Sequence, residues 1–191
     1  MRSVSGLLPI LALCAVAQVS ASEPPKDWVL AGSNPQEYNV GADRSNAHSG
    51  KASALLASKS DAAKGFGTLL QMVQAGSFQG KRLKFTAYVR SKDVRDWAGL
   101  WLRVDGSGSS QLAFDNMHDR PIKGDSDWQP YSIVLDVPKE ATAIAFGILL
   151  SGPGEVWIDT GTLETVDKTV PTTGTPAPQM PQAPSNLDFE Q

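Results

Sequence analysis

The stretch Arg82-Leu-Lys-Phe-Thr-Ala-Tyr-Val-Arg90 alternates strictly between apolar and polar side chains. Neighbouring side chains of a β-strand point to opposite faces, so this pattern predicts a strand with one buried face. The stretch Trp97-Ala-Gly-Leu-Trp-Leu-Arg-Val-Asp105 repeats the alternation. We therefore expect two successive strands, whose core sides carry Leu83, Phe85, Ala87 and Val89 in the first and Ala98, Leu100, Leu102 and Val104 in the second.

Short segments of the same kind fill most of the chain. Further strands are expected at residues 29–31, 37–42, 52–58, 67–74, 111–116, 128–137, 142–150 and 156–166. Turn-forming clusters such as Asp105-Gly-Ser-Gly-Ser-Ser110 separate them, and no stretch sustains an apolar stripe at helical spacing over three turns. Many short strands with frequent turns predict an all-β chain folded as an antiparallel two-sheet β-sandwich, with a jelly roll as the first choice.

The composition is that of an ordinary globular protein. The 191 residues are 41% hydrophobic and 19% charged, with a formal net charge of −3, which excludes disordered, collagen-like and coiled-coil classes. The chain is long enough to bury a core without a metal or a disulfide. It has no run of Lys and Arg, so we expect no binding to nucleic acid or to an anionic membrane surface.

Residues 1–21 have the features of a signal peptide. Arg2 precedes an apolar stretch at residues 7–17, and small residues precede a cleavage site after Ala21. A membrane-spanning helix needs about 20 apolar residues, so this stretch predicts export to the periplasm or the medium rather than a membrane span. Cys14 is the only cysteine, and its removal would leave the mature chain without a thiol or a disulfide.

The composition changes after the predicted sandwich, which we place at residues 22–168. Residues 169–185 hold five of the 13 prolines together with Thr, Gly, Gln and Ala, and this composition predicts an extended linker. Residues 186–191, Asn-Leu-Asp-Phe-Glu-Gln, then end the sequence. This tail is either a remnant of a second module or a strand that returns to the sandwich or crosses to a neighbouring molecule, which would allow self-association.

Three blocks resemble a known kind of module. They are Gly65-Phe-Gly-Thr-Leu-Leu-Gln71, the stretch from Trp97 to Gly106, and Leu112-Ala-Phe-Asp-Asn-Met117 followed by Asp119-Arg-Pro-Ile122. Together they resemble the bacterial jelly-roll module of the galactose-binding-like, carbohydrate-binding-module type. That module occurs as an accessory domain beside AraC-type regulators and exported hydrolases. The resemblance covers roughly residues 28–166 and implies a binding function without naming a ligand.

The resemblance also bears on metal binding, since a structural calcium is common among carbohydrate-binding jelly rolls. Related modules often carry paired acids in the last strand, whereas this chain has Trp157-Ile-Asp159 followed by Thr-Gly-Thr. Calcium takes six to eight oxygen ligands, and one Asp falls far short. No cofactor is therefore expected, and Asp159 is only a weak candidate for a metal ligand.

The sequence offers little to a catalyst. His48 and His118 are the two histidines, and they show no metal-binding spacing. A Gly-x-Ser-x-Gly elbow is absent from the sequence. The carboxylates at 115, 119, 125 and 127 lack the pattern of a glycoside-hydrolysing pair. We therefore expect that the protein is not an enzyme.

The outward sides of the two central strands are the best binding signal. Tyr88, Arg90, Trp101, Arg103 and Asp105 point away from the apolar set. Aromatic rings stack on the C–H patches of sugars, and the polar groups can bond the hydroxyls. We predict a ligand site on this face with a rim formed by Gln71, Asp115, Asn116, Asp119 and Arg120.

Two alternatives to that site remain open. Trp97 and Trp101 are equally consistent with rings that other parts of the chain cover, and only an exposed Trp101 would support binding. Asp119-Arg120 is as consistent with an internal salt-bridged corner as with a ligand contact.

The sequence thus predicts an exported, non-catalytic module that binds carbohydrate or another cell-envelope polymer on one sheet face. The alternative is a structural or protein-interaction accessory domain, a remnant of a larger hydrolase or regulator. Direct control of transcription is disfavoured, because the sequence shows neither a DNA-binding helix pair nor a basic patch.

Overall fold

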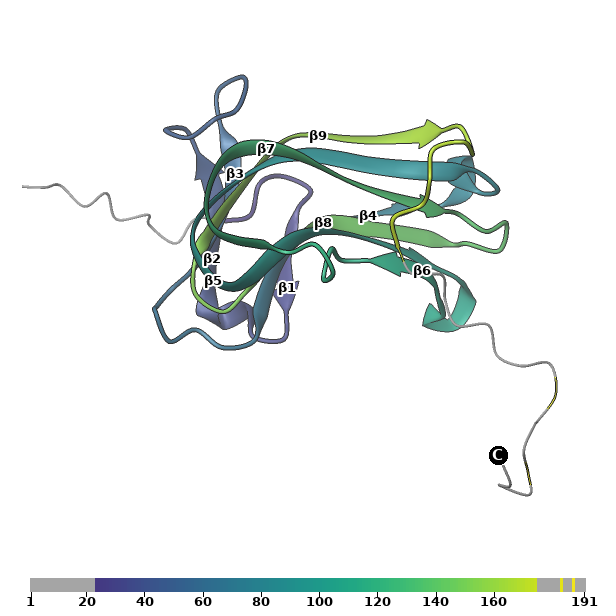
Figure 1. Cartoon of the computed structure of the whole chain (residues 1–191), viewed down its shortest axis with the longest axis horizontal. Helices are drawn as coiled ribbons and strands as arrows, with labels where there is room; N and C mark the ends of the chain where they lie inside the picture. The colour runs from purple at the N-terminus through teal and green to yellow at the C-terminus, as the bar shows by residue number, and fades with distance from the viewer. Residues whose placement is uncertain (1–22, 175–182, 184–186, 188–191) are drawn as a thin grey trace, which may run out of the picture.

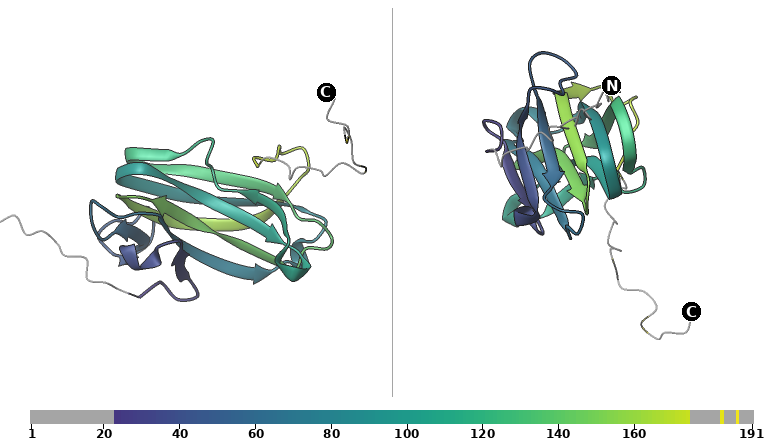
Figure 2. Two further views of the ribbon diagram at one scale, coloured as in Figure 1. Left: turned by 90° about the horizontal axis from the view of Figure 1, so that it is seen from below. Right: turned by 90° about the vertical axis from the view of Figure 1, so that its left-hand side faces the viewer.

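The chain folds into two stacked antiparallel layers (Figures 1 and 2). The computed structural model describes residues 23–174, 183 and 187. Its strands are β1 (Val29–Gly32), β2 (Tyr38–Asp43), β3 (Ser53–Ser58), β4 (Phe66–Gln74), β5 (Arg82–Asp105), β6 (Gln111–Asp115), β7 (Ile122–Asp136), β8 (Ala143–Ser151) and β9 (Glu155–Val166). Three short 3-10 turns complete the described elements, at Pro35–Glu37, Gly76–Phe78 and Ser107–Ser109. The predicted all-β sandwich is confirmed.

β5 belongs to both layers. Its first half pairs with β7 and β9, as in Leu83 opposite Leu135 and Thr165. Its second half pairs with β8 and β6, as in Leu102 opposite Phe146 and Asp115. We call the layer of β2, β3, β9, the first half of β5 and β7 sheet I, and the layer of β1, β4, β8, the second half of β5 and β6 sheet II. The prediction of two separate strands here was wrong, because 24 residues form one continuous strand.

A corner between Ser91 and Val94 turns β5 from one sheet into the other. The pairing register with β7 shifts there, and Asp93 has a φ of 50°. Gly154 supports the corner: its φ is 143°, and a Cβ on it would lie 2.7 Å from the Val94 Cα, so a larger residue does not fit. An added residue in a strand exchanges the faces of the side chains that follow. Odd positions such as Leu83 therefore face the core before the corner, and even positions such as Leu100 after it.

The core lies between the two sheets. Side chains from both layers are almost completely buried in it, among them Leu56, Leu69, Leu83, Phe85, Leu100, Leu102, Ile133, Ile144, Ile148 and Leu150. Both halves of β5 contribute to this cluster. The alternating apolar side chains of both halves of β5 therefore point into the same core.

The segment after β9 folds back against the sandwich. Arg82 donates from Nη1 to the carbonyl oxygens of Lys168 (2.7 Å) and Val170 (2.5 Å). Thr173 donates its N–H to the Val134 carbonyl (2.9 Å), and its hydroxyl oxygen accepts the Val134 N–H (2.9 Å). The packed chain therefore continues to Gly174, past the boundary predicted at residue 168. The predicted signal peptide, most of the linker and all of the tail except Leu187 lie outside the described residues.

Asp115, at the end of β6, holds this returning segment and a nearby corner together. Its carboxylate accepts hydrogen bonds from Arg120 Nη2 (2.5 Å), the Met117 N–H (2.8 Å) and the Thr173 hydroxyl (2.5 Å). Burial would raise the pKa of Asp115, but the bonds from Arg120, Thr173 and Met117 together hold the pKa below its ordinary value. Arg120 also pairs with the exposed Asp119 (2.8 Å). The salt-bridged corner that the sequence left open is therefore present.

Truncating a core side chain tests the shared core. We expect Leu100→Ala to lower the free energy of unfolding by about 2–5 kcal/mol, because the buried side chain leaves a cavity between the sheets. Val29→Ala, at a 55% exposed position of β1, should change it by less than about 0.5 kcal/mol. Urea denaturation followed by fluorescence measures both, and equal effects would contradict the described core.

Replacing Asp115 tests its role in holding the returning segment, through the dependence of stability on pH. A carboxyl whose folded pKa is lowered stabilises the fold above its unfolded pKa, and this contribution is lost as the pH falls through the folded pKa. We expect Asp115→Asn to lose about 3 kcal/mol at pH 7 and to lose less further stability than the unaltered chain between pH 5 and pH 2.

The matched control is Asp119→Asn, which removes a 77% exposed partner of the same arginine and should cost less than about 1 kcal/mol. Urea titrations across this pH range give the comparison. An unchanged pH profile in Asp115→Asn would contradict the role of Asp115.

Candidate functional site

The loop between β2 and β3 covers part of the outer face of sheet I, around Tyr88 and Trp128. The His48 ring stacks on Tyr88 with centroids 3.7 Å apart and planes 15° apart. The same ring meets Trp128 edge-on at 5.8 Å. Tyr88 was predicted to bind ligand, but one side of its ring already carries this stacked imidazole.

Polar groups fix the loop in that position. Arg90 donates from Nη1 to Asn46 Oδ1 (2.7 Å), and its guanidinium lies 5.7 Å from the centre of the Trp157 ring. Trp157 donates from Nε1 to Asp43 Oδ2 (2.8 Å). Burial would raise the pKa of Asp43, but hydrogen bonds from Ser45, Asn46 and Trp157 hold the pKa well below its usual range. Arg90, another predicted site residue, is thus engaged by the loop.

Asp159 anchors the same loop from β9. Its Oδ2 accepts the backbone N–H groups of His48 (2.8 Å) and Ser49 (3.0 Å), and its Oδ1 accepts the N–H of Thr160 (2.6 Å). The Asp159 carboxylate thus accepts hydrogen bonds from three backbone N–H groups, and this geometry is that of a loop anchor rather than of a metal ligand. Within residues 23–174 no group of three or more His, Cys, Asp or Glu side chains gathers to hold a metal.

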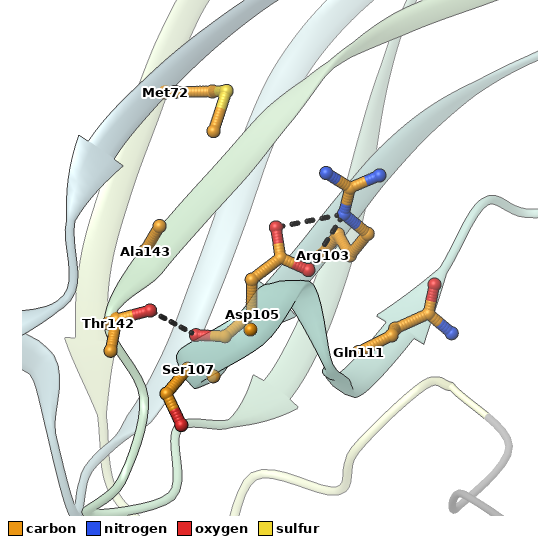
Figure 3. Close-up of a pocket in the computed structure, with 9 residues that line it drawn as sticks. Met72, Arg103, Asp105, Ser107, Gln111, Thr142 and Ala143 are labelled. Atoms are coloured by element: carbon orange, nitrogen blue, oxygen red, sulfur yellow. Dashed lines mark hydrogen bonds and ion pairs between the residues drawn. The ribbon is translucent and has the colours of Figure 1, made fainter.

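A cavity of about 440 Å³ lies at the corner of β5 and is lined by Arg90, Ser91, Lys92, Asp93, Asp125, Ser126 and Asp127. The outer face of sheet II carries two adjoining cavities. The first, the apolar cavity, has a volume of about 300 Å³ and is lined by Ala31, Gly32, Phe66, Thr68, Leu70, Met72, Trp101, Arg103, Phe114, Asn116, Ala145 and Leu149. The second, the polar cavity, has a volume of about 510 Å³ and is lined by Met72, Arg103, Asp105, Gly106, Ser107, Gly108, Gln111, Thr142 and Ala143 (Figure 3). Because Met72 and Arg103 line both, the two form one groove.

Trp101 forms the floor of the apolar cavity. Its register partner on β8 is Gly147, and its Nε1 donates to Thr68 Oγ1 on the next strand, β4 (2.7 Å). The indole therefore crosses β8 where that strand has no side chain. Only 7% of Trp101 is exposed, so the predicted exposed platform was wrong and the alternative of a covered ring is the one observed. Trp101 therefore gives no support to binding by itself, and a site on this face has to rest on the other residues that line the cavity.

Other apolar side chains build the walls around this floor. Phe66 and Leu70 come from β4 and Phe114 from β6, and each is half-buried against the cluster of Trp101, Ala145 and Leu149. Met72, also on β4, is 60% exposed. These walls were not predicted from the sequence. The available signal was the strand at 142–150, whose second face, with Ala143, Ala145 and Leu149, is apolar as well.

Arg103 and Asp105 form the polar side of the groove. The Arg103 Nε lies 3.0 Å from Oδ1 and 3.1 Å from Oδ2 of Asp105. Figure 3 shows both Nη atoms on the side of the guanidinium turned away from Asp105. The Arg103 side chain is 39% exposed. Its terminal N–H donors therefore remain available to a bound molecule.

The remaining predicted residues do not form a rim. Asn116 lines the apolar cavity. Gln71 lies on the opposite face of β4 from Thr68 and Met72, because strand neighbours alternate, so its placement on the rim was wrong. Asp115, Asp119 and Arg120 form the corner described above and do not line either cavity. Of the predicted set, Trp101, Arg103, Asp105 and Asn116 come together in the groove.

No protein-family profile matches the chain. Over 168 residues it is 45% identical to an uncharacterized HTH-type transcriptional regulator, YbfP, of Bacillus subtilis (strain 168). The match covers 87% of this chain and 57% of the regulator, so the chain spans a little over half of that relative. The described residues contain no α-helix, so within them the similarity falls on the β-sandwich.

Solved structures share the fold at low sequence identity. The enzymatically active domain of tailspike protein 4 of bacteriophage CBA120 gives a TM-score of 0.58 at 13% identity, over 74% of this chain and 20% of that one. The CBM22-1 xylan-binding domain of Paenibacillus barcinonensis Xyn10C gives 0.53 at 13%, over 76% and 90%. TmCBM61, solved with β-1,4-galactotriose, gives 0.51 at 16%, over 75% and 91%. The chain therefore has the β-sandwich fold found in carbohydrate-binding modules.

Proposed function

We propose that this protein is an exported, non-catalytic module that binds carbohydrate in the groove on the outer face of sheet II. The observation that carries the proposal is the pair of adjoining cavities, one apolar and one polar, on a single open face. Their volumes, about 300 and 510 Å³, fall within the roughly 300–1,000 Å³ common for small-molecule sites.

The chemistry of the groove suits a sugar. Aromatic and aliphatic walls can stack on the C–H faces of a pyranose ring. Arg103 supplies free N–H donors, and Asp105 and Gln111 line the same cavity. A sugar hydroxyl both donates and accepts, so a cation next to a carboxylate can bond it from either side.

The choice of sheet II over sheet I follows from what covers each face. The loop bearing His48 lies on Tyr88 and Trp128 over sheet I. On sheet II, the groove residues Met72 and Arg103 stay exposed at its centre. The solved relatives support the proposal by their names, since they include modules described with galactotriose and as xylan-binding.

The non-catalytic part of the proposal rests on the carboxylates. Among the described residues that line the two cavities, Asp105 is the only carboxylate, and it is paired with Arg103. Glycoside hydrolysis commonly needs two carboxyl groups placed across the sugar. The groove therefore suits binding better than hydrolysis.

Export rests on residues 1–21, which lie outside the described part of the chain. In the described part, no helix is long and apolar enough to cross a membrane. The regulator relative favours a second candidate function: a ligand-sensing or protein-interaction module of the kind that accompanies a DNA-binding domain.

Carbohydrate titrations test the first function. We expect a glycan array, followed by calorimetry with β-1,4-galactotriose and xylohexaose, to identify at least one binding sugar. Phe114→Ala and Arg103→Met should each weaken that binding about tenfold or more, because each removes a groove contact.

The control is Tyr88→Phe, which changes only the covered face and should leave the affinity unaltered. Silence across the array, or an equal loss in the Tyr88 variant, would refute the assignment to sheet II.

Light scattering tests the second candidate. If the module assembles through its C-terminal tail, the full mature chain should form dimers that disappear when residues 175–191 are removed. This truncation keeps the packed segment up to Gly174 intact. A monomer in both forms would remove tail-mediated self-association.

A further inference from the structure

The apolar cavity is poor in groups that could bond a sugar hydroxyl. Nine of its lining residues are apolar or glycine: Ala31, Gly32, Phe66, Leu70, Met72, Trp101, Phe114, Ala145 and Leu149. The others are Thr68, Arg103 and Asn116. A hydroxyl buried without a partner costs free energy, so the interior of this cavity favours an apolar group.

The threonine in this lining is already engaged. Thr68 is buried, accepts a hydrogen bond from Trp101 Nε1 (2.7 Å) and donates its own hydroxyl proton to the Ile148 carbonyl (2.8 Å). The polar groups with capacity for a ligand are therefore Arg103, which the two cavities share, and Asn116. Polarity in the groove is thus divided between its two halves.

The polar half presents a fork of donors with little net charge. Arg103 uses Nε to hold the carboxylate of Asp105, and its Nη atoms face away from that pair (Figure 3). Two N–H groups held in one plane match two neighbouring oxygen atoms, such as the vicinal hydroxyls of a sugar. Because Asp105 offsets the charge of Arg103, this half favours neutral hydroxyls over an anionic group.

From these two halves, we infer that the groove binds a glycoside with an apolar aglycone more tightly than an unsubstituted sugar, in which a pyranose ring has to take the place of the aglycone against the apolar walls. The vicinal hydroxyls of the sugar bond the Arg103 fork, and the aromatic or aliphatic aglycone fills the cavity above Trp101. Met72 stands where the two halves meet and contacts both parts. This inference rests on the proposed carbohydrate binding and names the class of carbohydrate.

Paired glycosides test the inference by calorimetry. The probes are the phenyl and methyl β-glycosides of galactose, glucose and xylose, with phenol as the sugar-free probe. We expect the phenyl glycoside of the preferred sugar to bind at least about tenfold more tightly than its methyl counterpart, since an apolar pocket rewards each buried carbon. Phenol alone should bind more weakly than the phenyl glycoside by a similar factor.

Matched variants locate the effect. Met72→Gln and Phe114→Ser should reduce the preference for phenyl over methyl several-fold, because each makes a wall of the apolar cavity polar. Val29→Gln makes the same kind of change at an exposed position of sheet II outside both cavities, and it should leave the preference intact. Thermal melts confirm that each variant is folded.

The outcomes separate this inference from the function beneath it. Equal affinity for phenyl and methyl glycosides would overturn the inference while carbohydrate binding stands. Phenol binding as tightly as the phenyl glycoside would overturn it by removing the role of the sugar. Failure of every glycoside and every array glycan to bind would overturn the proposed function, and this inference with it.

Discussion

The passage of one strand through both sheets is the constraint on which the rest of the structure depends. β5 pairs with β7 and β9 before its corner and with β8 and β6 after it. The corner between Ser91 and Val94 shifts the register and exchanges the faces of the side chains that follow. Both halves can therefore bury their apolar side in one core, as Leu83 and Leu100 do. Without this shift, one half of β5 would direct its apolar side chains to the outer face of its sheet.

The same corner gives the molecule two unlike outer faces. Tyr88 and Arg90 point out from sheet I, and Trp101 and Arg103 point out from sheet II, so the four side chains never share a surface. Sheet I is partly covered by its own loop, which Asp159 anchors through backbone N–H groups. Sheet II keeps a groove with Trp101 as its floor, opposite Gly147 of β8, where a Cβ would lie 2.1 Å from the Leu69 carbonyl oxygen of β4. Its open face is where binding chemistry is available.

Alternation in the sequence predicted the strands well, because a half-buried strand has a period of two that no helix shares. It did not predict that 82–105 is continuous, since alternation assigns side chains to faces within a strand but does not place strands in sheets. For this reason Tyr88 and Trp101 were predicted to lie in one ligand site, although they belong to different sheets. Gln71 was predicted on the rim of the site, but it lies on the opposite face of β4 from its neighbour Met72, which lines the groove. The cover on Trp101 comes from β4 and β6, which are distant in sequence, and Asp115 meets Thr173 only after the chain folds back.

Methyl NMR tests most directly whether a ligand occupies the groove of sheet II. The protein labelled on its methionine methyl groups would be titrated with a phenyl glycoside, with the imidazole C–H signal of His48 as the reporter of sheet I. We predict that the Met72 methyl signal moves in proportion to occupancy, while the buried Met117 methyl and the His48 signal stay in place. Movement of His48 with a stationary Met72 would contradict the account.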